Sequence, residues 1–347
     1  MIQVHRALEE CSTVVDLLRL RALHQPQQRA YTFLSNGEIE GATLTYAELD
    51  CQARALGAVL QNMQAQGQRG LMLYPPGLQF IEAFFGCLYA GVVAVPISPP
   101  HPARLEATLP KLRAVVANAQ PQIGLTTSSL LTMVEGLFPY VPYLRDMHWI
   151  STDGVVAGNK HAWHNPVVHG DSLAFLQYTS GSTAEPRGVM VSHANILHNQ
   201  RMIRSSFDHN EQSTTVGWLP LYHDMGLIGN VLQPLYIGSS CILMPPVSFL
   251  AHPFRWLNAI SNYQAHTSGG PNFAYDLCVQ KVTPEQRHSL DLTSWRIAFN
   301  GAEPVYHRTL ERFLATFAEC GLRRETLYPC YGLAEATLFA RAEPPDA

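Results

Sequence analysis

The sequence is poor in charged residues and has no paired cysteines. Charged residues make up 14% of the 347 residues, the formal net charge is -4, and no long basic run occurs. A nucleic-acid-binding surface is therefore not expected. The seven cysteines form no C-x-x-C pair, and their number is odd. Reduced thiols in a cytoplasmic protein fit this pattern better than a disulfide framework or a zinc site.

The chain also lacks a long apolar run. The most apolar stretch is residues 83–97, which is too short to span a bilayer and is interrupted by Gly86, Gly91 and Pro96. We interpret it as a buried helix followed by a buried strand. Residues 1–6 do not form the basic start of a secretory signal. We therefore expect no membrane span and a cytoplasmic location.

Two common nucleotide-binding motifs are missing. No G-x-G-x-x-G sequence occurs, which disfavours a Rossmann dehydrogenase. No Walker A motif occurs either, because Pro186 stands where its second glycine would be and no Lys-Ser/Thr pair follows. An ordinary P-loop NTPase is therefore disfavoured as well.

What is present is the pattern of a large α/β protein. Hydrophobic residues make up 47% of the chain, and its length exceeds that of a single core, so two or more packed subdomains are expected. Apolar runs alternate with helical patterns, which predicts largely parallel, buried sheets. We predict strands at 70–74, 92–97, 122–126, 172–178, 188–192 and 296–300. We predict helices at 45–60, 78–89, 105–119 and 193–206, and loops at 99–102 and 152–170.

The most informative segment is Y-T-S-G-S-T-A-E-P-R-G at residues 178–188, between two predicted strands. Gly181 lets the backbone turn tightly and bring N–H groups close to an anion. Arg187 supplies a fixed positive charge that suits phosphate oxygens. Four hydroxyl side chains surround the glycine: Thr179, Ser180, Ser182 and Thr183. The segment fits a loop for nucleotide phosphates, and the simpler alternative is a surface turn.

This loop resembles the signature of the adenylate-forming superfamily, Y-T-S-G-S-T-G-x-P-K-G. Ala184 replaces a glycine, and Arg187 replaces the lysine but keeps its charge. Three later segments resemble the family's other motifs and keep their order: residues 218–229, 300–304 and 331–337. The resemblance runs from about Leu17 to Glu343, and the text at residues 74–96 is similar to fatty acyl-AMP ligases.

The resemblance implies the fold and the roles of individual residues. It implies the N-terminal domain of an adenylate-forming enzyme, with stacked, largely parallel sheets in pseudo-repeated subdomains at about 1–170 and 171–347, the first with exchange of elements. The second subdomain would hold the phosphate loop and the adenine site. ATP would be bound by Thr179, Ser180, Gly181, Ser182, Thr183, Arg187, Gly301, Ala302, Glu303, Tyr331 and Gly332. Mg²⁺ would be held by Glu335 and Thr179, the substrate carboxylate by His223, and the acyl chain by Gly270, Phe273 and Tyr275.

Each of these roles has a plainer alternative. His223 and Asp224 form a plausible capping pair at a helix start. Glu303 fits the dipole of a helix opening after residue 304, and Glu335 fits the first turn of another helix. Phe273 and Tyr275 are equally plausible as core aromatics.

By resemblance, a fatty carboxylate attacks the α-phosphate of ATP, pyrophosphate leaves, and the acyl group of the acyl adenylate later passes to the phosphopantetheine of an acyl carrier protein. Such enzymes serve polyketide or lipopeptide biosynthesis. The family's ribose-binding aspartate and its lysine-bearing C-terminal domain lie further downstream. We therefore expect an incomplete, N-terminal part of such an enzyme, slow in acyl-AMP formation by itself. The alternatives are a long-chain acyl-CoA ligase and a non-catalytic nucleotide- or acyl-binding module. A structural scaffold fits four ordered motifs least well.

Overall fold

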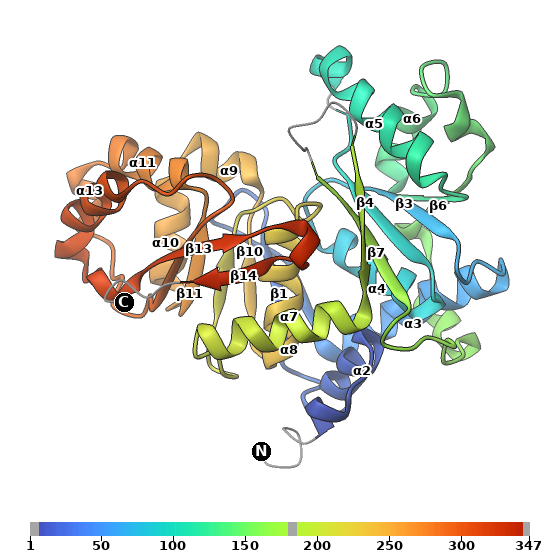
Figure 1. Ribbon diagram of the computed structural model, residues 1–347, viewed down its shortest axis with the longest axis horizontal. Coiled ribbons are helices and arrows are strands. Elements are labelled where there is room, and N and C mark those ends of the chain that lie inside the picture. The colour runs from blue at the N-terminus through green and yellow to red at the C-terminus, as the bar shows by residue number, and fades with distance from the viewer. Residues whose placement is uncertain (1–6, 101, 180–185, 343–347) are drawn as a thin grey trace. The chain divides into compact units, whose positions relative to one another are not determined.

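The computed structural model describes residues 7–100, 102–179 and 186–342, which divide into two compact units, each with its own sheet (Figure 1). Unit 1 comprises Met1–Gln27 and Tyr46–Leu197, and unit 2 comprises Gln28–Thr45 and His198–Ala347. Both sheets are largely parallel and accompanied by helices, which confirms the predicted α/β class. The division at Leu197, beyond the expected 170, assigns both strands flanking the phosphate loop to unit 1.

The sheet of unit 1 has six strands in the order β6-β5-β3-β4-β7-β8. Neighbouring strands are parallel except for the pair β7–β8, which is antiparallel. The strands are β3 (Arg69–Leu73), β4 (Val93–Ile97), β5 (Ile123–Thr126), β6 (His148–Ser151), β7 (Leu173–Tyr178) and β8 (Gly188–Ser192). The non-sequential order follows from crossover connections, which parallel neighbours require.

Helices between these strands complete unit 1. The apolar stretch after residue 77 forms a helix whose last eight residues are buried, followed by the fully buried strand β4, as predicted. Gly86 lets this helix approach its neighbour closely, because a Cβ there would lie 2.5 Å from Leu56 Cδ2. The helices are α2 (Val14–His24), α3 (Tyr46–Asn62), α4 (Leu78–Ala90), α5 (Leu105–Ala119), α6 (Ser128–Glu135) and α7 (His193–Ser206), the last continuing into unit 2. Short 3₁₀ turns are η1 (Pro102–Arg104), η2 (Pro142–Asp146), η3 (Thr152–Gly154) and η4 (Ala157–Ala162).

The predicted loop at 152–170 is irregular but packed. It contains η3 and η4, and its Trp163 is buried to 9% exposure. Trp163 Nε1 donates a hydrogen bond of 2.8 Å to the carbonyl oxygen of Tyr89 at the end of α4. Arg54 lies over the same ring at 4.4 Å, a cation–π contact. Trp163 therefore anchors this mostly exposed segment to α3 and α4 of unit 1.

The sheet of unit 2 has eight strands in the order β14-β13-β12-β11-β9-β10-β1-β2. Its interior is parallel, and its two edge pairs, β13–β14 and β1–β2, are antiparallel. The early strands β1 and β2 therefore belong to the second unit. The strands are β1 (Arg29–Leu34), β2 (Glu40–Thr45), β9 (Thr215–Gly217), β10 (Cys241–Leu243), β11 (Thr267–Gly270), β12 (Ile297–Asn300), β13 (Leu327–Gly332) and β14 (Phe339–Ala342).

Aromatic side chains build the core beneath the helices of unit 2. Trp256 meets Tyr275 and Trp295 edge to face, with ring centroids 5.7 and 5.6 Å apart, and Phe313 on α13 meets both of them. The helices α11 and α13 lie side by side (Figure 1). The helices are α8 (Gln233–Ile237), α9 (Pro246–Ala251), α10 (Phe254–Asn262), α11 (Asn272–Lys281), α12 (Pro284–Arg287) and α13 (His307–Phe317), with the π-helix η5 (Met225–Leu232) and the 3₁₀ turns η6 (Ala318–Cys320), η7 (Arg324–Thr326) and η8 (Ala334–Ala336). Over the described ranges of both units, every helix is too short or too polar to cross a bilayer.

Candidate functional site

The predicted phosphate loop connects the antiparallel strands β7 and β8 in unit 1. The ladder ends at the pair Tyr178–Gly188, and the N–H of Thr179 donates to the carbonyl oxygen of Arg187 at 3.4 Å. The side chain of Arg187 is exposed directly before β8. The two predicted strands that flank the loop are confirmed. Four of the residues assigned to phosphate lie outside the described part: Ser180, Gly181, Ser182 and Thr183.

Tyr178 anchors the base of this loop. Its hydroxyl donates to Asn118 Oδ1 on α5 at 2.5 Å. A Cβ on Gly188 would lie 2.8 Å from Tyr178 Cζ, so the glycine makes room for the ring. Burial raises the pKa of Tyr178, which keeps the phenol protonated as a donor. The first and last residues of the loop are therefore held by the ladder and by α5.

In unit 2, His223 lies between β9 and the π-helix η5. Its side chain is 51% exposed, and its Nδ1 is 2.6 Å from Asp224 Oδ1. The same carboxylate oxygen accepts from the N–H of Met225 at 2.7 Å, so Asp224 caps η5. A Cβ on Gly226 would lie 2.1 Å from the carbonyl oxygen of Pro220, so only glycine fits there. Asp224 therefore caps the helix, while the imidazole of His223 remains exposed.

The residues assigned to the acyl chain differ in their surroundings. Gly270 ends β11, and a Cβ there would lie 2.6 Å from Trp218 Cζ2. Phe273 is 42% exposed and meets the Trp218 ring edge to face, with centroids 6.1 Å apart. Tyr275 is fully buried and donates to the carbonyl oxygen of Phe299 at 2.7 Å. The core-aromatic alternative therefore describes Tyr275, whereas Phe273 offers an accessible ring.

The segment 301–306 is a loop between β12 and α13. A Cβ on Gly301 would lie 2.9 Å from the carbonyl oxygen of Cys330, so this loop packs closely on β13. Ala302 has a φ of +67°, a conformation that costs a non-glycine residue free energy. Glu303 is exposed, and its Oε1 accepts from the N–H of Phe273 at 2.7 Å. The expectation that a helix opens directly after residue 304 is corrected, because α13 begins at His307.

Tyr331, Gly332 and Glu335 lie on β13 and the turn after it. The ring of Tyr331 is 66% exposed on its strand. A Cβ on Gly332 would lie 2.1 Å from the carbonyl oxygen of Leu338, so the close β13–β14 pairing requires glycine there. Glu335 is exposed in the first turn of the 3₁₀ helix η8. Glu335 therefore lies at a helix start, as the plainer alternative predicts. Its carboxylate is nevertheless accessible.

A magnesium ion carried by a nucleotide fits the donor set of unit 2. Within the described ranges, no group of three or more His, Cys, Asp or Glu side chains is arranged as a metal cluster. Mg²⁺ in nucleotide sites takes one or two carboxylates together with phosphate oxygens and water. A single accessible carboxylate such as Glu335 suits that role, whereas a tightly held metal ion in an all-protein cage would need more ligands.

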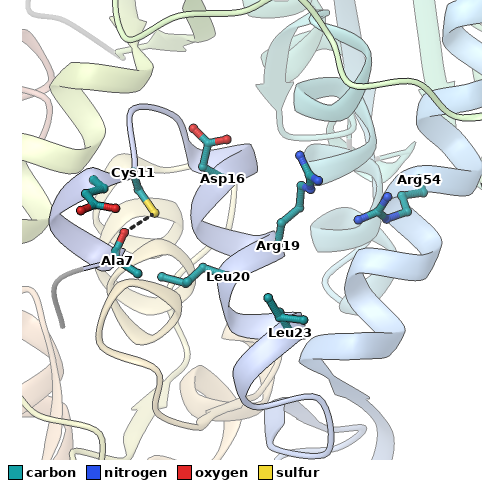
Figure 2. A pocket seen from close by; sticks show the side chains of 8 residues that line it. Ala7, Cys11, Asp16, Arg19, Leu20, Leu23 and Arg54 are labelled. Carbon is teal, nitrogen blue, oxygen red and sulfur yellow. Dashed lines mark hydrogen bonds between the residues drawn. The ribbon is translucent and has the colours of Figure 1, made fainter. Parts of the chain in front are cut away.

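A surface hollow of about 390 Å³ in unit 1 involves none of the expected site residues. Figure 2 shows Arg19 and Leu23 of α2 facing Arg54 of α3, with Cys11 and Asp16 on the other side. Burial and the neighbouring Asp16 raise the pKa of the Cys11 thiol to about 11. A protonated thiol is a poor nucleophile, and the lining charges are of both signs, so this hollow shows no specific chemistry.

Sequence reasoning missed two residues beside the expected sites of unit 2. Trp218 lies under Gly270 and stacks on Phe249 at 4.0 Å, and its Nε1 has no hydrogen-bond partner among the described residues. Asn272 is 4% exposed at the start of α11 and hydrogen-bonds to groups from residue 300 to residue 309. The available signal for Trp218 was its place at the start of the 218–229 motif, and that for Asn272 was its place between Gly270 and Phe273.

Comparison with known proteins identifies the family. The family model described as AMP-binding enzyme matches residues 18–347, nearly the whole chain. The chain belongs to the AMP-binding enzyme family. Two relatives of this AMP-binding enzyme are medium-chain-fatty-acid–[acyl-carrier-protein] ligases. JamA of Moorena producens is 47% identical, with 95% of this chain and 56% of the relative covered. TtuA of Teredinibacter turnerae is 35% identical, with 96% and 57% covered.

Solved structures agree with this assignment. A fatty acyl-adenylate ligase from L. pneumophila, crystallised with acyl adenylate and pyrophosphate, matches this AMP-binding enzyme with a TM-score of 0.91 and 45% identity, covering 98% of this chain and 58% of that one. The predicted family and the N-terminal-domain fold of adenylate-forming enzymes are therefore confirmed. The chain spans about half the length of the curated relatives that it matches.

Proposed function

We propose that this chain carries the nucleotide- and acid-binding part of an ATP-dependent ligase that activates a fatty acid as its acyl adenylate. The observation that carries the proposal is the match over 98% of the chain to a ligase solved with acyl adenylate and pyrophosphate. The motifs assigned from the sequence occupy the same kind of place in both units: turns that directly follow strands or, for residues 331–337, the end of β13 and the turn after it. In α/β proteins, ligands bind at such carboxyl ends of strands.

The reaction needs positioning and charge stabilisation more than covalent catalysis. A carboxylate oxygen of the acid attacks the α-phosphorus of ATP, a new P–O bond forms, and the bond to the leaving pyrophosphate breaks. We assign the pyrophosphate charge to Arg187 and the hydroxyls of its loop. We assign the adenine to Tyr331 and the 301–303 loop, and the acid's carboxylate to His223. Mg²⁺ at Glu335 would neutralise phosphate charge.

The acyl chain is assigned to the region of Gly270 and Phe273. The Trp218 ring packs directly against Gly270, and Phe273 is exposed beside the same ring. A long chain suits apolar walls because each buried methylene contributes about 0.8 kcal/mol. The relatives' names, which specify medium-chain fatty acids, support an acid of that class here as well.

Two experiments test this proposal. Titration of the chain with a non-hydrolysable acyl-sulfamoyl adenosine, followed by calorimetry, should show saturable binding that weakens when the acyl chain is shortened. Fatty-acid-dependent exchange of pyrophosphate into ATP should then appear in the whole protein. Absence of both binding and exchange would overturn the proposal.

Two alternatives remain distinct outcomes of these tests. Binding without exchange in the whole protein would support a non-catalytic binding module. The acyl-CoA ligase alternative is favoured by a relative named putative fatty-acid–CoA ligase FadD21 of Mycobacterium tuberculosis, which is 36% identical over 94% of this chain. Efficient formation of acyl-CoA by the whole protein would support this alternative.

A further inference from the structure

The start of helix α11 is capped by a side chain from another element. The first N–H groups of a helix have no acceptor within it, and they are usually satisfied by the residue at the N-cap. The residue at the N-cap of α11 is Pro271, which makes no side-chain cap. Instead, Glu303 Oε1 accepts from the N–H of Phe273 at 2.7 Å. A carboxylate at this position also complements the positive end of the helix.

A second link joins the same helix start to the same loop. Asn272 Oδ1 accepts from the backbone N–H of Tyr306 at 3.1 Å and from Asn300 Nδ2 at 3.4 Å. Asn272 Nδ2 donates to Thr309 Oγ1 on α13 at 3.2 Å. Asn272 and Asn300 are both buried. The first turn of α11 is therefore tied to the end of β12, to the loop and to α13.

The loop itself is held in a conformation that needs such support. Ala302 has a φ of +67°, and strained residues of this kind persist where their surroundings determine the conformation. Gly301 packs against the carbonyl oxygen of Cys330, the residue before Tyr331. One continuous set of contacts thus runs from Tyr331 through the 301–303 loop to Glu303 and Phe273.

We propose that Glu303 is a positioning residue that couples binding of the acid to binding of the nucleotide. This inference rests on the proposed function, which assigns adenine to the 301–303 loop and Tyr331, and the acyl chain to Phe273. Because Glu303 Oε1 holds the N–H of Phe273, a ligand that orders either end of this link favours the conformation that the other ligand needs. Each ligand therefore increases the affinity of the other by the same factor.

The coupling factor is measured by calorimetry on the chain. The affinity for α,β-methylene-ATP with Mg²⁺ is determined with and without saturating dodecanoate. In the wild type, the acid should strengthen nucleotide binding within the roughly 5- to 150-fold range typical of coupled sites. Glu303→Gln should keep most of this factor, because its amide oxygen accepts from the same N–H. Glu303→Asp keeps the charge but is one methylene too short, so its factor should fall towards one.

The control variant is Glu319→Ala, whose carboxylate pairs with Arg287 on the surface of the same unit, away from the loop. It should leave the coupling factor unchanged, and thermal melting should show that all variants are folded. Coupling that follows charge instead, kept in Asp and lost in Gln, would overturn the inference, since Glu303 would then act on a ligand directly. Binding of both ligands with equal coupling in all variants would also overturn it while leaving the proposed function standing. A wild-type chain that binds neither ligand would overturn both.

Discussion

Glu335 combines an ordinary backbone position with an accessible carboxylate. It is exposed in the first turn of a 3₁₀ helix, and no side chain in the described part of the chain pairs with it. A structural acid at such a position contributes little to folding, because exposed helix-terminus charges are worth about 0.3–1 kcal/mol. An effect of this carboxylate on activity can therefore be separated from an effect on stability.

Glu335→Gln should weaken magnesium-dependent adenylation without unfolding the protein. The substitution removes the charge of the carboxylate that we propose as a metal ligand and barely alters the shape of the side chain. In the whole protein, pyrophosphate exchange should need a higher Mg²⁺ concentration and run at least tenfold more slowly at a fixed low Mg²⁺ level. Glu325→Gln is the matched control, because Glu325 lies exposed in the first turn of another 3₁₀ helix. Unchanged magnesium dependence would mean that Glu335 is only a turn residue.

Tyr331→Ala should raise the KM for ATP about tenfold, because stacking of a base on an aromatic side chain is worth about 1–3 kcal/mol. Tyr331→Phe keeps the ring and should stay close to wild type. The side chain is 66% exposed, so neither variant should lower the melting temperature by more than a few degrees. A comparison of initial rates across ATP concentrations tests this, and equal losses in Ala and Phe would contradict stacking.

At the scale of the element, a buried histidine holds the first turn of α2 in unit 1. The N–H of Val14 donates to His193 Nδ1 at 3.2 Å, and the imidazole is 1% exposed. Burial lowers the pKa of His193 from 6.5 to about 4, and the charge of Asp16 opposes this only partly. Because Nδ1 accepts this hydrogen bond, protonation of the ring would break the contact.

The pKa of His193 predicts acid sensitivity with a defined sign. The folded state holds the histidine neutral. The contribution of neutral His193 to the free energy of unfolding is therefore complete above pH 6.5 and is lost as the pH falls towards 4. The difference between the two pKa values corresponds to about 3 kcal/mol. His193→Asn keeps an acceptor near Nδ1 and removes the titration, so its free energy of unfolding should fall less between pH 7 and pH 4.5. Urea titrations at several pH values measure this.

The control for this experiment is the exposed His161, whose replacement by Asn should leave the pH dependence unchanged. Burial also lowers the pKa of His209 in unit 2, to about 3, so some acid sensitivity should remain in His193→Asn. A wild-type pH dependence in His193→Asn would show that the other buried groups account for the whole effect.

At the scale of the whole molecule, the cysteines report on unfolding. All seven are free thiols, and burial raises the pKa of Cys87 and of Cys330 to about 12. The thiolate is the reactive form, so these residues should resist iodoacetamide at pH 8 in the native protein and react only after unfolding. Mass spectrometry of labelled peptides with and without urea tests this. Fast labelling of Cys87 under native conditions would contradict the packing around α4.

The acyl acceptor is also a property of the whole protein. We expect transfer to the phosphopantetheine arm of an acyl carrier protein rather than to free coenzyme A, in line with the names of JamA and TtuA. Coenzyme A differs from that arm mainly by its charged nucleotide end, which a site can reject by offering it no charge partner or no room. The whole protein, supplied with ATP, Mg²⁺ and a fatty acid, should acylate a carrier protein much faster than coenzyme A. Efficient acyl-CoA formation would favour the alternative ligase.

Local pattern was enough to locate the family and most regular elements of unit 1, but few of those of unit 2. The helices 105–119 and 193–206 and the strand 188–192 have the bounds predicted from the sequence, because hydrophobic periodicity and capping act over one or two turns. The ordered motifs, each a run of adjacent residues, likewise identified the AMP-binding enzyme family. Short strands such as β9 and β10, with three residues each, carry too little pattern to be recognised.

What the sequence by itself determined is therefore the α/β class, the family and the segments that follow strands. Only the tertiary structure decided which helix Glu303 stabilises. The sequence suggested the dipole of the helix that follows it, but the carboxylate caps α11 by accepting from the N–H of Phe273, thirty residues earlier. It also decided that residues 28–45 join unit 2 and that Tyr275 is buried. The physical reason is that the partner of a side chain or edge strand depends on packing between distant segments, which no local periodicity encodes.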